Sequence, residues 1–130
     1  MITVLTHLMF QGEAERALEL YSSIFKEFQI GQVEKFGLGE QGERGTFKLA
    51  HVSLAGHKLL IFNSPPIHDF SFTPSMSLFV NFDTQAELES VFSKLSSDGK
   101  IMMPLDHYGF STKFAWIADR FGVSWQLNLP

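Results

Sequence analysis

The hydrophobic and polar positions of this chain recur in the same order twice. An apolar run at residues 2–10 precedes apolar residues that fall three and four apart, namely Ala17, Leu20, Tyr21 and Ile24. A second run at residues 76–82 precedes the same spacing at Leu88, Val91, Phe92 and Leu95. This spacing predicts, in each half, an amphipathic helix that lies on a sheet.

Each helical segment is followed by strand-like runs that meet at a glycine. Residues 48–62 align with residues 114–128, with Gly56 matched to Gly122, and both predict a strand, a glycine turn and a second strand. Each half therefore predicts a βαβββ module, and the whole chain predicts an α+β fold. We expect one domain over residues 1–130, divided into a first repeat at about 1–64, a linker at about 65–74 and a second repeat at about 75–130.

Local signals mark the helix ends and one loop. Thr84 and Glu87 have the spacing of a capping box, and Gly99 suits the left-handed position after that second helix. The first helix is expected at about residues 13–26. Residues 37–42 match the pattern G-x-G-x-x-G, but a strand follows them where a nucleotide site needs a helix. We therefore interpret them as a hairpin loop.

The composition of the chain excludes several classes of protein. The 130 residues are 45% hydrophobic and include no cysteine, which excludes disulfides, thiolate metal sites and a cysteine nucleophile. No apolar run is long enough to span a membrane and no signal segment is recognised, so we expect a cytoplasmic protein without a membrane partner. The net charge of −4 and the scattered Lys and Arg residues argue against a nucleic-acid partner. Phenylalanine is abundant at 14 residues, and some of these are expected to line a cavity or a subunit interface.

A set of short motifs occurs in order along nearly the whole chain. They are residues 9–15 with Ala17, Leu18 and Tyr21, then residues 51–54, 56–59, 99–105, 108–109, 114–115 and 119–125. Together with the repeated module they resemble the PhnB-like proteins of the vicinal oxygen chelate superfamily, which includes glyoxalase I, extradiol dioxygenases and bleomycin-resistance proteins. Some relatives carry a name that implies demethylubiquinone methyltransferase activity. We do not expect that activity, because the chain has no glycine-rich strand-to-helix turn for S-adenosylmethionine.

The resemblance implies that the modules form a cup-shaped mixed sheet with the helices on its outer face. In metal-using relatives, four strands each place one ligand inside this cup. Aligning the halves with one another and with the glyoxalase pattern puts these positions at Thr6, Leu60, Ser77 and Gln126. Leucine cannot ligate, and the other three are weak neutral donors where a catalytic divalent site needs histidine or carboxylate. No cofactor is therefore predicted, and a divalent metal is disfavoured.

Two histidines are the alternative metal candidates. His7 is adjacent to Thr6, so alternation along the strand is expected to turn it toward the helix side of the sheet. His51 belongs to the resembling motifs, but its expected partner in the other half is Ile117. That pairing argues against symmetric chelation.

Alternation also predicts which side chains line the cup. The expected ligand-binding residues are Thr6, Leu8, Phe10, Leu60, Phe62, Ser77, Phe79, Asn81, Ser124 and Gln126, with Asn128 beside them. They mix aromatic walls with uncharged hydrogen-bonding groups, which is typical of a small-molecule pocket. The alternative is a closed core, in which these hydroxyl and amide groups would need other partners. Their neighbours Leu59, Ile61, Leu78, Val80, Trp125 and Leu127 are expected under the helices.

Three functions follow as hypotheses. The preferred one is binding of a small, partly aromatic or amphipathic molecule without the usual divalent metal site. The second is a metal-dependent or acid/base enzyme, an isomerase, lyase or dioxygenase, with catalytic candidates Asp106, His107 and Tyr108. The third is a dimerisation scaffold that uses Phe70 and Phe72. Similar proteins pair as homodimers, so a homodimer is expected by resemblance.

Overall fold

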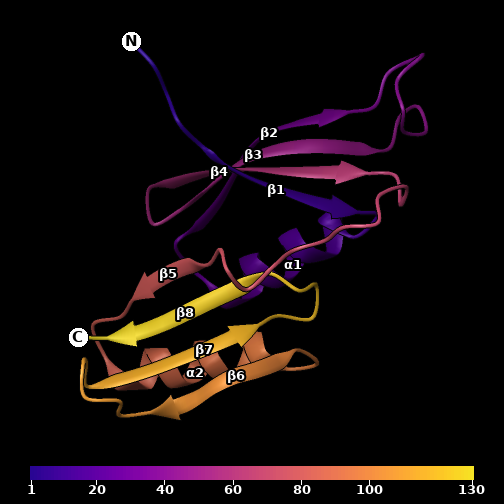
Figure 1. Cartoon of the computed structure of the whole chain (residues 1–130). Helices are drawn as coiled ribbons and strands as arrows, with labels where there is room; N and C mark the ends of the chain where they lie inside the picture. Colours follow the sequence, from indigo (N-terminus) through magenta and orange to yellow (C-terminus); the bar gives the residue numbers. More distant parts are fainter. The chain divides into compact units, whose positions relative to one another are not determined.

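The chain divides into two compact units. The computed structural model describes residues 1–130, and its contacts separate Met1–Ser71, here called unit 1, from Phe72–Pro130, here called unit 2. Each unit holds one helix and one four-stranded sheet, labelled in Figure 1. Neither helix is long and apolar enough to cross a bilayer.

Unit 1 has the element order βαβββ. Its elements are β1 (Thr6–Gln11), α1 (Ala14–Ile24), β2 (Phe28–Lys35), β3 (Phe47–Leu54) and β4 (His57–Ser64). The strands lie in the order β1-β4-β3-β2, in which β1 is parallel to β4 and the other neighbours are antiparallel. Residues 37–42 lie in the loop between β2 and β3, as predicted.

Unit 2 repeats this arrangement. Its elements are β5 (Leu78–Asn81), α2 (Gln85–Ser96), β6 (Lys100–Asp106), β7 (Lys113–Ala118) and β8 (Ser124–Leu129). The strand order β5-β8-β7-β6 is that of unit 1, and β5 is parallel to β8. The predicted α+β fold of tandem βαβββ modules is therefore confirmed.

One face of each sheet packs against the helix of its own unit. In unit 1, Ala14, Ala17, Leu18 and Tyr21 of α1 are buried, as are alternate sheet residues such as Leu59 and Ile61. In unit 2, the buried residues of α2 are Leu88, Val91 and Leu95, and those of the sheet include Ile117, Trp125 and Leu127. Burial of these apolar side chains is the main term that stabilises each unit. The opposite face, which carries no helix of its own unit, is called the open face.

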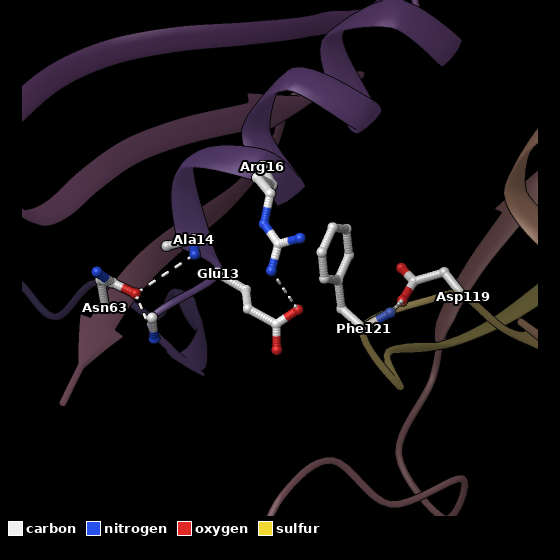
Figure 2. A network of polar contacts seen from close by, with 7 residues as sticks. Glu13, Ala14, Arg16, Asn63, Asp119 and Phe121 are labelled. Carbon is white, nitrogen blue, oxygen red and sulfur yellow. Dashed lines mark hydrogen bonds and ion pairs between the residues drawn. The ribbon is translucent and has the colours of Figure 1, made fainter. Parts of the chain in front are cut away.

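The start of α1 is capped from a distant strand. Glu13, at the N-cap, makes no capping bond with its side chain, whereas Asn63 Oδ1 of β4 accepts from the backbone N–H groups of Gly12 at 2.9 Å and Ala14 at 3.3 Å. Figure 2 shows these bonds. Asn63 thus occupies the amides that a helix start leaves unpaired and joins the helix to the sheet.

The N-terminal end of α2 agrees with the prediction from the sequence, and the C-terminal end corrects it. Thr84 Oγ1 accepts from Glu87 N at 3.2 Å, which is one bond of the predicted capping box. The left-handed residue after the helix is Asp98, with φ of 59°, and not Gly99. Gly99 is needed for space instead, because a Cβ there would lie 2.2 Å from the carbonyl oxygen of Ala118.

A buried aspartate organises the turn between β7 and β8. Asp119 Oδ1 accepts from the backbone amides of Phe121 at 2.9 Å and Val123 at 3.1 Å, and its Oδ2 accepts from the indole of Trp125 at 2.9 Å. The bond to Phe121 is drawn in Figure 2. The motif at residues 119–125 therefore has a structural explanation: it closes the hairpin and fixes Trp125 in the core.

Candidate functional site

The open face of unit 2 consists of rows that run across all four strands. Paired residues in neighbouring strands point to the same face, so the pairing gives one row of Asn81, Asn128, Phe114 and Asp106. The next row is Phe79, Gln126, Trp116 and Met103. Ser77 and Ser124, whose hydroxyls lie 2.7 Å apart, follow on the same side. The predicted residues of β5 and β8 thus share one face, while their role in ligand binding stays a prediction.

Most polar groups on this face bond to one another. Ser124 Oγ accepts from the indole Nε1–H of Trp116 at 2.9 Å, and Gln126 Nε2 donates to Ser77 Oγ at 3.2 Å. The hydroxyl pair Ser77–Ser124 joins these two bonds into one network. These four side chains therefore have partners without any bound molecule.

Asn128 is the exception. Its Nδ2 donates to Asn81 Oδ1 at 2.8 Å, but its own Oδ1 is buried and accepts no hydrogen bond. Only 9% of the Asn128 residue is exposed. Buried polar atoms in native proteins are almost always paired, so this oxygen stands out as an acceptor without a partner in the chain.

An aromatic cluster lies beside this amide. The buried ring of Phe114 has the rings of Phe79, Tyr108 and Phe110 around it, at centroid distances of 6.3, 6.1 and 5.0 Å. Phe79 is 54% exposed and Phe110 is 62% exposed. Sequence reasoning missed Phe110, Phe114 and Trp116. Extending the alternation of β8 to its neighbour β7 would have found the last two, since Ala115 and Ile117 alternate with them.

The three catalytic candidates lie at the edge of this cluster. Asp106 ends the row that contains Phe114, and its Oδ1 accepts from the backbone amide of His107 at 2.7 Å. The hydroxyl of Tyr108 donates to the carbonyl of Pro104 at 2.5 Å. Asp106 and His107 are exposed. Tyr108 therefore joins the site as a ring, and the catalytic role of all three stays a prediction.

The open face of unit 1 corrects the predicted orientation of β1. His7 pairs with Leu60 and Met9 with Phe62, whereas Thr6 pairs with Leu59 on the helix face. Thr6, Leu8 and Phe10 therefore point toward the helix side, and Phe10 is buried there. The reason is a register one residue away from the expected one, which exchanges the two faces of a strand.

His7 consequently lies on the open face, not on the helix side. Its ring centroid is 5.6 Å from that of Phe62, and His51 pairs with Leu60 from the opposite side. The row across the sheet is therefore His7, Leu60 and His51, with both imidazoles exposed. Thr6 instead bonds His57 through its hydroxyl at 3.0 Å.

The residue of unit 2 that corresponds to His51 also differs from the prediction. Leu60 pairs with His51, and the matching residue Gln126 pairs with Trp116 and not Ile117. The turn of unit 1 holds Ala55 and Gly56 between paired Leu54 and His57, whereas in unit 2 the bond from Asp119 N to Val123 O spans residues 120–122. One additional residue in the second turn therefore shifts the alignment of the preceding strand by one.

The donor set does not fit the usual divalent site. With the observed pairing, the equivalent positions on the outer and central strands are His7 and Leu60 in unit 1, and Phe79 and Gln126 in unit 2. Only His7 is a strong donor among them. No group of three or more His, Asp or Glu side chains is placed to hold a metal ion.

One carboxyl group has a clearly shifted pKa, and this group, Glu40, lies outside the two open faces. Glu40, in the loop after β2, accepts hydrogen bonds from Lys48 Nζ and from the amide of Gly37. The bond to Lys48 is the main cause that holds the pKa of this carboxyl below its usual range, and the Gly37 amide adds to it. Lys48 also lies over the ring of Phe36, so this pair fastens the loop to the sheet.

Two βαβββ modules with one shared strand order define a glyoxalase-fold protein. The chain belongs to the family whose model is described as 3-demethylubiquinone-9 3-methyltransferase, which matches residues 2–128. This confirms the resemblance to PhnB-like proteins of the glyoxalase, bleomycin resistance and dioxygenase superfamily. No curated protein matches the chain.

Solved structures agree with this assignment. A PhnB protein from Bacillus cereus, described as a 3-demethylubiquinone-9 3-methyltransferase, is 42% identical with a TM-score of 0.90, and the match covers 99% of this chain and 100% of that one. Protein PA1353 from Pseudomonas aeruginosa is 23% identical with a TM-score of 0.84, over 99% and 98% of the two chains. The fosfomycin resistance protein FosX from Listeria monocytogenes shares the fold at 10% identity and a TM-score of 0.65, over 100% and 95%.

Proposed function

We propose that this chain binds a small, partly aromatic molecule on an open sheet face and that the binding needs no divalent metal. The observation that carries the proposal is the aromatic cluster of Phe79, Tyr108, Phe110 and Phe114 on unit 2. It lies next to the amide of Asn128. Aromatic walls with a few placed polar groups are the usual composition of a small-molecule site.

Exposure of the rings favours a binding surface over a filled core. A core residue of this size would be almost fully buried, yet Phe79 and Phe110 are more than half exposed. Contiguous exposed apolar side chains mark binding sites more often than isolated ones do. The network of Ser77, Ser124, Gln126 and Trp116 joins the polar side chains of the face to one another beside the rings.

The side chains at the usual ligand positions support metal independence. Leu60 and Phe79 have no ligand atom, and Gln126 offers only a neutral amide oxygen. This leaves one histidine where relatives that use a metal supply several strong donors.

We also propose that the chain pairs with itself as a homodimer. Light scattering after size exclusion measures the molar mass of the particle and so tests this pairing.

The test compares two phenylalanines of similar exposure. Phe79 is 54% exposed within the cluster, and Phe70 is 58% exposed in the segment before unit 2. Chelator-treated full-length protein is titrated with phenol, indole and benzamide by ligand-observed NMR. We expect binding to persist without metal, to weaken about tenfold in Phe79→Ala and to stay unchanged in Phe70→Ala.

Two results would contradict the proposal. One is that none of the three compounds binds, or that each binds only after a divalent metal is restored. The other is that Phe70→Ala and Phe79→Ala weaken binding equally, since the loss would then reflect general hydrophobic adsorption.

A further inference from the structure

The buried oxygen of Asn128 narrows the class of ligand. Oδ1 of this residue has no hydrogen-bond partner, while Nδ2 of the same amide is engaged with Asn81. The free group is thus an acceptor and not a donor. A hydrogen bond to it has to come from a molecule that carries an N–H or O–H group.

The neighbours of Asn128 add an aromatic requirement. In its row, Asn128 is flanked by Asn81 on one side and by Phe114 on the other. Phe114 is in turn surrounded by the exposed rings of Phe79, Phe110 and Tyr108. A ring that packs on these side chains can carry its donor toward the amide, because the two features are adjacent in the sheet.

Charge on this part of the face disfavours an anion. The rows of Asn128 and Gln126 contain no Lys or Arg, and the first row ends in the carboxylate of Asp106. Oδ1 of Asp106 accepts from the amide of His107, and the residue is exposed. An anionic ligand would find a carboxylate and an unpaired acceptor here instead of a cationic partner.

We infer that the open face of unit 2 binds an uncharged or cationic aromatic compound bearing an N–H or O–H donor, which bonds Asn128 Oδ1 while its ring packs on Phe79 and Phe110. The inference rests on the proposed function and specifies its ligand. It separates this site from one that recognises carboxylates or phosphonates.

The experiment compares probes that differ in the donor alone or in charge. Phenol, its methyl ether anisole, and benzoate are titrated into the full-length protein, and dissociation constants are obtained by NMR. Phenol is expected to bind about tenfold more tightly than anisole, because only phenol pairs the buried oxygen. Benzoate is expected to bind more weakly than either.

A variant of Asn128 tests whether this residue causes the preference for phenol over anisole. Asn128→Leu has a similar volume but no acceptor, so phenol and anisole should bind it within about twofold of each other. If that variant does not fold, the comparison of phenol with anisole on the unaltered chain decides.

Three outcomes overturn the inference. Equal affinities for phenol and anisole would mean that the acceptor is held by water, and the proposed function would stand with a different ligand class. A preference that survives in Asn128→Leu would place the donor contact elsewhere. Binding of benzoate alone would replace the donor class by an anion. Failure of every aromatic probe would instead refute the proposed function itself.

Discussion

Asp119 should be the polar residue on which the stability of unit 2 depends most. It is 3% exposed and accepts three N–H bonds, from Phe121, Val123 and the Trp125 indole. In Asp119→Asn, Oδ1 can still accept from the two backbone amides, but an NH₂ group would then face the indole N–H. One charge-assisted bond is lost and two donors oppose each other, which should cost about 2–4 kcal/mol of unfolding free energy.

Asp119→Ala removes both acceptor oxygens and with them all three bonds, which should cost about 3–5 kcal/mol, since three donors lose their partner. The assay is urea unfolding followed by circular dichroism at constant pH. The exposed Asp69 provides the control, because Asp69→Asn should change the unfolding free energy by less than about 0.5 kcal/mol.

A double-mutant cycle isolates the contact with the indole. Trp125→Phe removes the donor that opposes the new amide, so the Asp119→Asn substitution should cost at least about 1 kcal/mol less in that background. Additive effects of the two substitutions would refute the assignment of Asp119 Oδ2 to Trp125. A loss below about 1 kcal/mol in Asp119→Ala would refute the structural account of the turn.

Three further predictions concern other parts of the fold. Asn63→Ala should lower the unfolding free energy by about 1–2 kcal/mol in the same assay and Asn63→Asp by less, because only aspartate keeps the acceptor for Gly12 and Ala14; equal losses would contradict the cap. Gly99→Ala should cost about 1–3 kcal/mol through its clash with Ala118 O, whereas Asp98→Gly should cost nothing because glycine tolerates positive φ; a neutral Gly99→Ala would contradict the close approach. The Glu40–Lys48 pair stabilises the ionised carboxylate, so its contribution is present above the usual glutamate pKa and is lost as the pH falls through the lowered pKa. In an NMR titration, Lys48→Met should return the Glu40 pKa toward its usual value, and an unchanged pKa would show that Lys48 is not the cause.

The sequence predicted the module pattern and the faces of β8 correctly for a clear physical reason. In β8, Ser124, Gln126 and Asn128 alternate with Trp125 and Leu127, so only one orientation buries the apolar set. In β1, by contrast, Leu8, Met9 and Phe10 are consecutive apolar residues. Alternation cannot choose a face there, and the pairing of β1 with β4 is set by tertiary packing.

Other features depend on contacts that are distant in the chain. The bond between Ser77 and Ser124 and the cap from Asn63 join residues that no local pattern connects. The sequence did hold one signal for the cap. Glu13, the residue before the helix start at Ala14, is a poor capping residue, so the first amides of the helix needed an acceptor from elsewhere in the chain. Only the high phenylalanine content indicated the aromatic cluster. That content gives the number of rings but not their positions in the fold.

The two tryptophans of unit 2 allow the most direct test of binding to the open face. Trp116 lies on the open face with its indole bonded to Ser124, and Trp125 lies on the helix face with its indole bonded to Asp119. Chelator-treated, ¹⁵N-labelled protein is titrated with phenol, and the two indole N–H signals are followed by NMR. The account predicts a saturable shift of the Trp116 signal with the Trp125 signal unmoved. A Trp116 signal that stays in place while phenol binds, or a larger shift at Trp125, would contradict it.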